Sequence, residues 1–143
     1  MSGLAAGPRR RAREVAFRVA FQADVAGDTY SLAWKLREEE EQLTADQREL
    51  IVDIVKFLES NGAEVDTKLR ECAEHWPLQR LAATDRAVLR IAVAELLARP
   101  GSPARVVIDE AIDMAGTYGG DESGRFVNGV LDRAARALRP TEF

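Results

Sequence analysis

The chain has 143 residues, 46% hydrophobic and 31% charged, a balance typical of a soluble globular protein with one domain or two small packed halves. Cys72 is the single cysteine, which excludes an intramolecular disulfide and makes a reducing cytoplasm the simplest setting. No apolar stretch is long enough to span a membrane or form a signal-peptide core, so we expect a cytoplasmic protein.

Positive charge is concentrated at the start of this acidic chain. The net charge is −4, yet residues 1–25 carry five arginines against Glu14 and Asp24, a net of +3. Such a cluster indicates a local anion site, and phosphate backbones are the commonest anionic partners of arginine clusters. Judged on these residues alone, nucleic-acid binding and simple solvation of a helix end are equally supported. The four arginines that stand together are Arg9, Arg10, Arg11 and Arg13.

The first quarter of the chain predicts an arm and two helices. Residues 1–8 are expected to form a flexible arm. Apolar residues at helical spacing predict a helix over 9–25, which Gly27 ends. Thr29 or Ser31 is then placed to cap a short second helix.

The next segment predicts two more helices separated by a break. Thr44 and Gln47 have the spacing of a capping box, and an amphipathic stripe follows them. Residues 60–62, Ser-Asn-Gly, predict the break before another helix over 63–72. A turn at 75–77 and one helical turn at 78–81 complete this half.

The second half predicts three helices with clear start and stop signals. Thr84 is expected to cap the first, and Pro100-Gly101 to end it. Ser102-Pro103 predicts the next helix, Gly119-Gly120 its end, and a last helix starts near Ser123. Because no strand alternation occurs, the sequence predicts an all-α bundle of about seven helices.

Residues suited to catalysis are scarce. His75 is the only histidine, and although Cys72 is three residues away, no third group is suggested that would orient a nucleophile or complete a metal site. We therefore expect no enzymatic activity, no cofactor and no bound metal. Two acidic groups are interpreted as solvated surfaces, namely the run Glu38–Glu41 and the set Asp109, Glu110 and Asp113.

One glycine interrupts a helical pattern. Gly129 follows Asn128 inside the apolar repeat of the last helix, where glycine costs roughly 1 kcal/mol relative to alanine. Something is therefore expected to approach the backbone there. A neighbouring helix is favoured over a ligand.

Three segments together resemble one protein family. They are Arg9–Glu14, the stretch Asp85–Ala92 with residues 95–97, and residues 107–111 running to Arg125–Asp132. The pattern is similar to that of NusB, the bacterial transcription antitermination factor. The likeness covers nearly the full length, and the segment Phe-Val-Asn-Gly-Val-Leu-Asp at 126–132 is its most specific part.

The resemblance implies a fold and a function. The fold would be a single domain, 1–143, of two packed three-helix subdomains at 9–75 and 78–139. The protein would bind the boxA element of nascent single-stranded RNA together with NusE, a small-subunit ribosomal protein. This pair would join an antitermination complex on RNA polymerase that suppresses premature termination, most clearly on ribosomal RNA operons. Some members self-associate as homodimers, and the sequence leaves open whether this chain does.

The resemblance also implies site residues. The RNA-binding set is Arg9, Arg10, Arg11, Arg13, Arg125, Phe126 and Asn128. The partner-facing set is Phe21, Asp85, Arg86 and Arg90. Two departures from the family pattern, Phe21 in place of a common tyrosine and Gly124 in place of a larger residue, could retune RNA contacts.

Two other functions are compatible with such a fold. NusB-like domains form the N-terminal part of some RNA cytosine methyltransferases, but this chain shows no cofactor-binding domain, so that reaction is not expected. The second alternative is a helical scaffold that binds a protein and no RNA. Salt-sensitive RNA binding would separate the scaffold from an RNA-binding protein.

Overall fold

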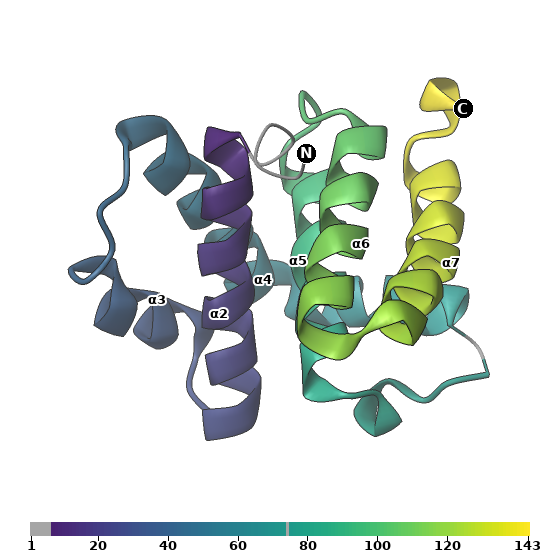
Figure 1. Ribbon diagram of the computed structural model, residues 1–143, viewed down its shortest axis with the longest axis horizontal. Coiled ribbons are helices and arrows are strands. Elements are labelled where there is room, and N and C mark those ends of the chain that lie inside the picture. Colours follow the sequence, from purple (N-terminus) through teal and green to yellow (C-terminus); the bar gives the residue numbers. More distant parts are fainter. Residues whose placement is uncertain (1–6, 74) are drawn as a thin grey trace.

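The computed structural model describes residues 7–73 and 75–143 (Figure 1). Across these ranges the regular structure consists of six α-helices and two short 3₁₀ turns, without a strand. The all-α prediction is confirmed, and the count of seven helices is one too high. Most of the predicted arm, residues 1–6, lies outside the described residues. No helix in the described part of the chain is both long and apolar enough to cross a bilayer.

Local signals set the ends of the first helices. Helix α2, Pro8–Ala26, ends at Gly27, whose φ of 74° is the left-handed conformation that glycine adopts without steric cost. Helix α3, Tyr30–Glu38, is capped by Thr29, whose hydroxyl accepts a hydrogen bond from the Leu32 backbone N–H at 3.1 Å.

Helix α4 is longer than the sequence predicts. It spans Ala45–Cys72 and begins with the predicted capping box, in which Thr44 and Gln47 satisfy each other's backbone N–H groups. The break predicted at 60–62 is a kink: Asn61 leaves helical geometry with φ −131°, yet the helix continues beyond it. The predicted break is therefore confirmed as a kink at Asn61, and the two predicted segments count as one helix, which accounts for the excess in the helix count.

The second half follows the predicted order with shifted starts. Turn η1 is Leu78–Arg80, and the helices are α5, Ala83–Ala98, α6, Ala104–Gly119, and α7, Asp121–Leu138, followed by η2, Pro140–Glu142. Thr84 does not cap α5, because Ala82 holds that position without a side-chain cap. Likewise α7 begins two residues before the predicted Ser123.

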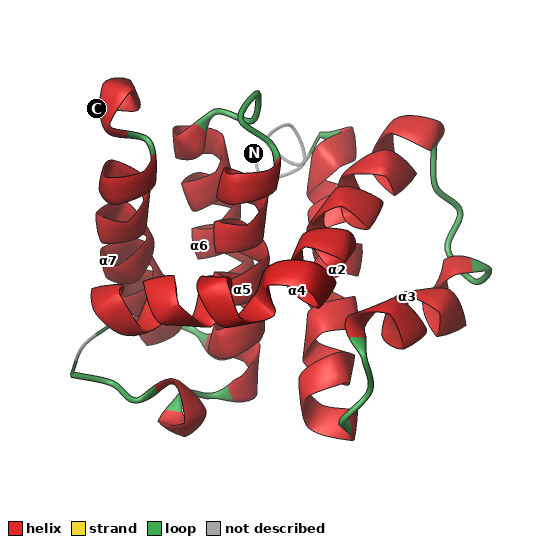
Figure 2. Ribbon diagram, turned by 180° about the vertical axis from the view of Figure 1, so that it is seen from behind, coloured by secondary structure: helices red, strands yellow, loops and turns green. Residues whose placement is uncertain are grey.

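The helices form two groups that share one core. Figure 1 shows α2 and α3 on one side, with α5, α6 and α7 on the other. Figure 2 shows α4 running across the back of both groups, and it contacts α2, α3, α5 and α7. Helices α6 and α7 lie side by side and antiparallel, because Gly120 alone connects them. The largest fully buried apolar side chains are Val15, Val19, Leu50, Ile51, Ile54, Val65, Leu69, Leu89, Ile108, Met114 and Leu131.

A buried ion triad links three helices within this core. Arg13 of α2 is 3% exposed, and its guanidinium donates to both oxygens of Glu95 on α5 at 2.7 and 2.6 Å. A third N–H group donates to Glu110 on α6. The interpretation of Glu110 as a solvated surface residue is therefore wrong, because Glu110 pairs with Arg13, a buried cation that is distant in the sequence.

The triad keeps Arg13 charged. Burial is the largest influence and lowers the pKa of Arg13, but the hydrogen bonds and charges of Glu95 and Glu110 together outweigh it and raise that pKa. Glu95 and Glu110 share the guanidinium of Arg13, so each of the three charges is compensated by the others and not by water. Removing Arg13 would leave two buried acids without a counter-ion.

The triad predicts a large loss of stability for Arg13→Ala. We expect the free energy of unfolding to fall by about 3–5 kcal/mol, the usual result of breaking a buried ion pair. Urea denaturation at neutral pH measures it. Arg9→Ala is the matched control on the same helix, and its exposed pair with Asp46 should cost at most about 1 kcal/mol. Equal losses for the two variants would contradict a stabilising role of the triad.

The connection between α6 and α7 predicts a second effect. Gly120 has φ 91° and ψ 179°, a conformation almost restricted to glycine, so Gly120→Ala should cost about 1–3 kcal/mol. Gly116→Ala is the control, because that residue is helical and a Cβ there meets nothing within 4 Å. The control should be neutral or stabilising by up to about 1 kcal/mol. Thermal unfolding of both variants distinguishes backbone strain from a general intolerance of alanine in this region.

Candidate nucleic-acid interface

The arginine-rich head of α2 contacts several other elements. Arg9 lies 3.3 Å from Asp46 on α4, and Arg10 lies 3.4 Å from Asp113 on α6. Arg11 lies 2.8 Å from Glu41, which follows α3. Each of the three therefore already faces a carboxylate. A phosphate that binds here has to compete with an intramolecular acid.

Arg13 is not part of this surface. Helical periodicity turns its side chain inward, where Glu95 and Glu110 enclose it. The prediction that Arg13 binds RNA is wrong for this structure, because no external phosphate reaches a guanidinium that is 3% exposed. The four arginines thus differ in exposure: the side chains of Arg9 and Arg11 are 43% and 49% exposed, that of Arg10 is 12% exposed, and Arg13 lies in the core.

A pair of aromatic rings forms a second candidate surface. Phe126 of α7 is partly buried against the core, and Trp76, in the segment before η1, is 58% exposed. Their ring centroids are 6.1 Å apart with planes at 78°, an edge-to-face contact. Arg125 is exposed beside them, and it forms no salt bridge within the described ranges. The sequence did not reveal Trp76 as a site residue, because the exposure of a ring in a turn depends on tertiary packing.

Several pockets border α7. One of about 490 Å³, between α6 and α7, is lined by Asn128 and Arg125 together with Asp113 and Gly124. Gly124 is buried against α6, where an added Cβ would meet the side chain and the carbonyl oxygen of Ile112 at 3.6 Å. The structure therefore places three of the predicted RNA-binding residues, Arg125, Phe126 and Asn128, on neighbouring turns of α7.

A further pocket, of about 320 Å³, contains Asp85. Trp76 and Phe126 line it with Arg80 and Ser123. Asp85 is 9% exposed, and its Oδ1 atom has no hydrogen-bond partner among the described residues. A buried carboxylate oxygen without a donor is costly, so a donor from a bound molecule would be favoured there.

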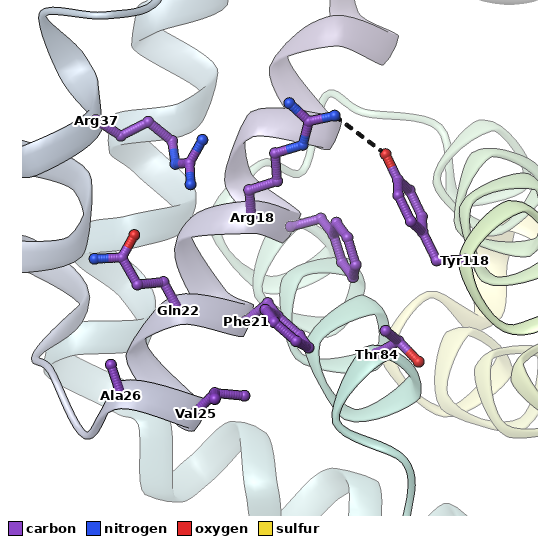
Figure 3. Close-up of a pocket in the computed structure, with 9 residues that line it drawn as sticks. Arg18, Phe21, Gln22, Val25, Ala26, Arg37, Thr84 and Tyr118 are labelled. Atoms are coloured by element: carbon purple, nitrogen blue, oxygen red, sulfur yellow. Dashed lines mark hydrogen bonds between the residues drawn. The ribbon is translucent and has the colours of Figure 1, made fainter.

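Phe21 lines a separate apolar groove of about 440 Å³ (Figure 3). Phe17 and Tyr118 stack along one wall with ring centroids 4.7 Å apart. Arg18 donates a hydrogen bond of 3.4 Å to the Tyr118 hydroxyl at the rim. Val25 is 62% exposed at the end of α2 and adds apolar surface. Such a groove suits the apolar side chains of a protein partner.

Two predicted partner-facing residues have internal roles instead. Arg86 donates to Asp24 at 2.6 Å and to the Leu81 backbone carbonyl at 2.9 Å. Arg90 donates to Asp66 at 2.9 Å. Both guanidinium groups are largely buried and tie α5 to α2 and α4, so each already has an internal role, and their contact with a partner stays a prediction.

The described residues offer no catalytic arrangement. Cys72 is buried, and burial raises the pKa of its thiol, which disfavours the reactive thiolate. Within the described part of the chain, no three histidine, cysteine or acidic side chains are grouped so that they could hold a metal ion. The surfaces above are suited to binding.

Known proteins show the same sequence pattern and the same fold. The NusB family profile matches residues 10–136. Transcription antitermination protein NusB of Anaeromyxobacter dehalogenans is 42% identical over 136 residues, which is 92% of this chain and 93% of that protein. The protein of that name from Koribacter versatilis is 37% identical over 133 residues, 92% of this chain and 91% of its own length.

Solved structures agree. The structure of T. maritima NusB superimposes with a TM-score of 0.84 at 36% identity, covering 94% of this chain and 95% of that one. A crystal structure of the antitermination factors NusB and NusE in complex with double-stranded RNA gives a TM-score of 0.80 at 28% identity, covering 90% and 96%. Family membership also confirms the prediction that the protein is not an enzyme. The chain belongs to the NusB family of transcription antitermination proteins.

Proposed function

We propose that this NusB-family antitermination factor binds single-stranded boxA-type RNA together with NusE. The pair acts in the cytoplasm, joins the antitermination complex on RNA polymerase and suppresses premature termination on ribosomal RNA operons. The observation that carries the RNA part of the proposal is the Trp76–Phe126 ring pair beside Arg125, which forms no salt bridge with a described carboxylate. A relative of the same fold has been solved with NusE and double-stranded RNA, which supports both partners.

The ring pair favours unpaired bases. Sequence-specific RNA recognition commonly uses splayed bases that stack on aromatic rings or guanidinium planes, and a base inside a duplex cannot stack in this way. Trp76 is exposed enough to receive a base, and Phe126 supports it from the edge. Asp85 lines the adjoining pocket together with both rings. Single-stranded RNA therefore fits this surface better than a duplex.

The arginines at the start of α2 contribute to RNA binding in a different way from the ring pair. A phosphate that binds Arg9 or Arg11 replaces Asp46 or Glu41, so the gain is the difference between two ion pairs. These arginines remain partly exposed, and they attract RNA over longer distances before close contact. We propose that Arg9, Arg10 and Arg11 steer the strand, while the α7 surface supplies most of the short-range binding energy.

The groove lined by Phe21 is the proposed contact for NusE. It is apolar, it lies at the end of α2, and Thr84 of α5 forms part of its wall. Asp85 is the next residue along α5 and lines the pocket next to the ring pair. A protein seated on the groove would therefore lie beside the RNA surface. The alternative function, a protein-binding scaffold without RNA, keeps the groove but makes no use of the ring pair.

Phe126→Ala tests the RNA surface. We expect affinity for a fluorescent single-stranded boxA-like RNA to fall by about 1–3 kcal/mol, the usual contribution of one stacked base. The salt dependence should stay unchanged, because no phosphate contact is lost. Fluorescence anisotropy over a salt series, with and without NusE, measures both quantities.

Phe143→Ala is the matched control, since it removes a partly exposed aromatic that Arg105 and Arg136 contact elsewhere. It should leave RNA affinity unchanged. A duplex of the same sequence should bind more weakly than the single strand. If Phe126→Ala stays folded by its melting temperature and binds RNA as tightly as the wild type, the scaffold function becomes the better explanation.

Val25→Asp tests the groove. An exposed valine tolerates the change in the folded state, but a charge in an apolar interface weakens association, and we expect a loss of about tenfold or more in NusE affinity. RNA binding by the protein alone should not change. Val106→Asp, an exposed valine on α6 that does not line the groove, serves as the control in calorimetric titrations. Equal NusE affinity for both variants would refute this docking site.

A further inference from the structure

We propose that a pocket between the end of α4 and the middle of α7 is a phosphate subsite for the RNA strand. The inference rests on the RNA binding proposed above and extends it to the far side of the ring pair. The pocket has a volume of about 200 Å³. Two aromatic rings, Trp76 and Phe126, and two cations, Arg125 and Arg133, line it. The other lining residues are Ala73, His75, Gly129 and Val130.

Gly129 explains why the pocket exists. A Cβ on this residue would meet only the Nη2 atom of Arg133, at 3.7 Å, and nothing else within 4 Å. The expected close approach of a neighbouring helix is therefore absent from the described structure, and that prediction is wrong. Glycine is disfavoured in a helix interior, and no packing contact compensates for it here. Its consequence is a bare stretch of backbone inside the pocket.

Arg133 is held over that bare stretch. Its Nε atom donates a hydrogen bond of 3.2 Å to the Gly129 carbonyl oxygen one turn earlier. The two terminal nitrogens of the guanidinium form no hydrogen bond within the described residues, so they remain able to donate to a ligand. A guanidinium presented in this way matches the paired oxygens of a phosphate.

The charge balance separates this pocket from the head of α2. Arg9, Arg10 and Arg11 each lie within 4 Å of a carboxylate. Neither Arg125 nor Arg133 does so in the described ranges, and no described acid lines the pocket. A phosphate that binds Arg125 or Arg133 would therefore displace no carboxylate of the described residues. The gain should exceed that of an equivalent contact at the head, where an acid must first be displaced.

The two aromatic rings identify the phosphate as part of a nucleic acid. A base stacked on Trp76 or Phe126 brings the neighbouring phosphodiester of the same strand close to the two arginines that line the pocket. Rings for bases and cations for the backbone are the combination that single-strand binding surfaces use. An acidic peptide would need the cations but would gain little from the ring pair, so RNA is the occupant that the pocket favours.

The test compares full-length variants in the RNA titration. Arg133→Gln should weaken binding of single-stranded boxA-like RNA by about five- to tenfold at low salt, and lower the slope of log affinity against log salt by about 0.7, one phosphate contact. Arg133→Lys should keep the slope. Arg136→Gln, an exposed arginine on the same helix that pairs with Asp132, is the control and should change neither quantity.

Gly129→Ala provides an independent measurement. Alanine favours the helix, so the melting temperature should rise, while the added methyl group fills the pocket and RNA affinity should fall. A fall in affinity together with increased stability cannot be attributed to unfolding.

The outcomes separate the two proposals. If the wild type binds RNA, and Arg133→Gln and Gly129→Ala match the Arg136→Gln control in affinity and slope, the subsite is wrong while the proposed RNA-binding function stands. A loss of NusE affinity without any loss of RNA affinity would show that the pocket is a protein contact, which also overturns the subsite. If the wild type binds no RNA with or without NusE, both proposals fail.

Discussion

The placement of α2 depends on one buried ionic interaction. Arg13 donates to Glu95 of α5 and Glu110 of α6, so three helices share a single charged cluster inside the core. Such a cluster is costly to desolvate, and its components stabilise the fold only when all are present. An apolar residue at this position could pack against other apolar side chains in several helix orientations. Arg13 instead needs Glu95 and Glu110 opposite its N–H groups. The triad therefore sets the register of α2 against the other helices.

The other three arginines at the start of α2 extend this arrangement. Three consecutive residues connect the N-terminal end of α2 to three other elements. Arg9 contacts α4, Arg10 contacts α6, and Arg11 contacts the segment after α3. Their ion pairs lie at the surface and are individually weak. Their positions nonetheless follow from the burial of Arg13, because the helix rotation that directs Arg13 inward directs its neighbours to either side. The basic head is thus both a structural junction and a region of positive charge.

The binding surfaces are built around the helices that the triad positions. The groove at the C-terminal end of α2 and the pocket beside the Trp76–Phe126 ring pair are separated by the start of α5, where Thr84 lines the groove and Asp85 lines the pocket. A shift of α2 relative to α5 would therefore change the groove while leaving α7 in place. Substitutions can therefore change the proposed protein-binding groove and the proposed RNA-binding surface separately, although both surfaces depend on the same core.

Sequence alone determined the features that local interactions control. The all-α class, the capping box at Thr44 and the helix end at Gly27 depend on residues a few positions apart, and the structure contains each of them. Three segments together indicated the family, the motif at 126–132 being the most specific, and the glycine within that motif marked an unusual position in α7. The break at Asn61 was located correctly, and it takes the form of a kink because the packing of α4 against both helix groups carries the helix through it.

Tertiary structure decided which charges are available for binding. Arg13, Arg86 and Arg90 look like surface cations in the sequence, and only partners distant in the chain show that they are internal. Arg133 lacks such a carboxylate partner in the described structure, which no local pattern reveals. The exposure of Trp76 and its contact with Phe126 likewise join segments 50 residues apart. Periodicity fixes which residues share a helix face, but the strength of an ion pair and the burial of a side chain depend on what the fold places opposite that face.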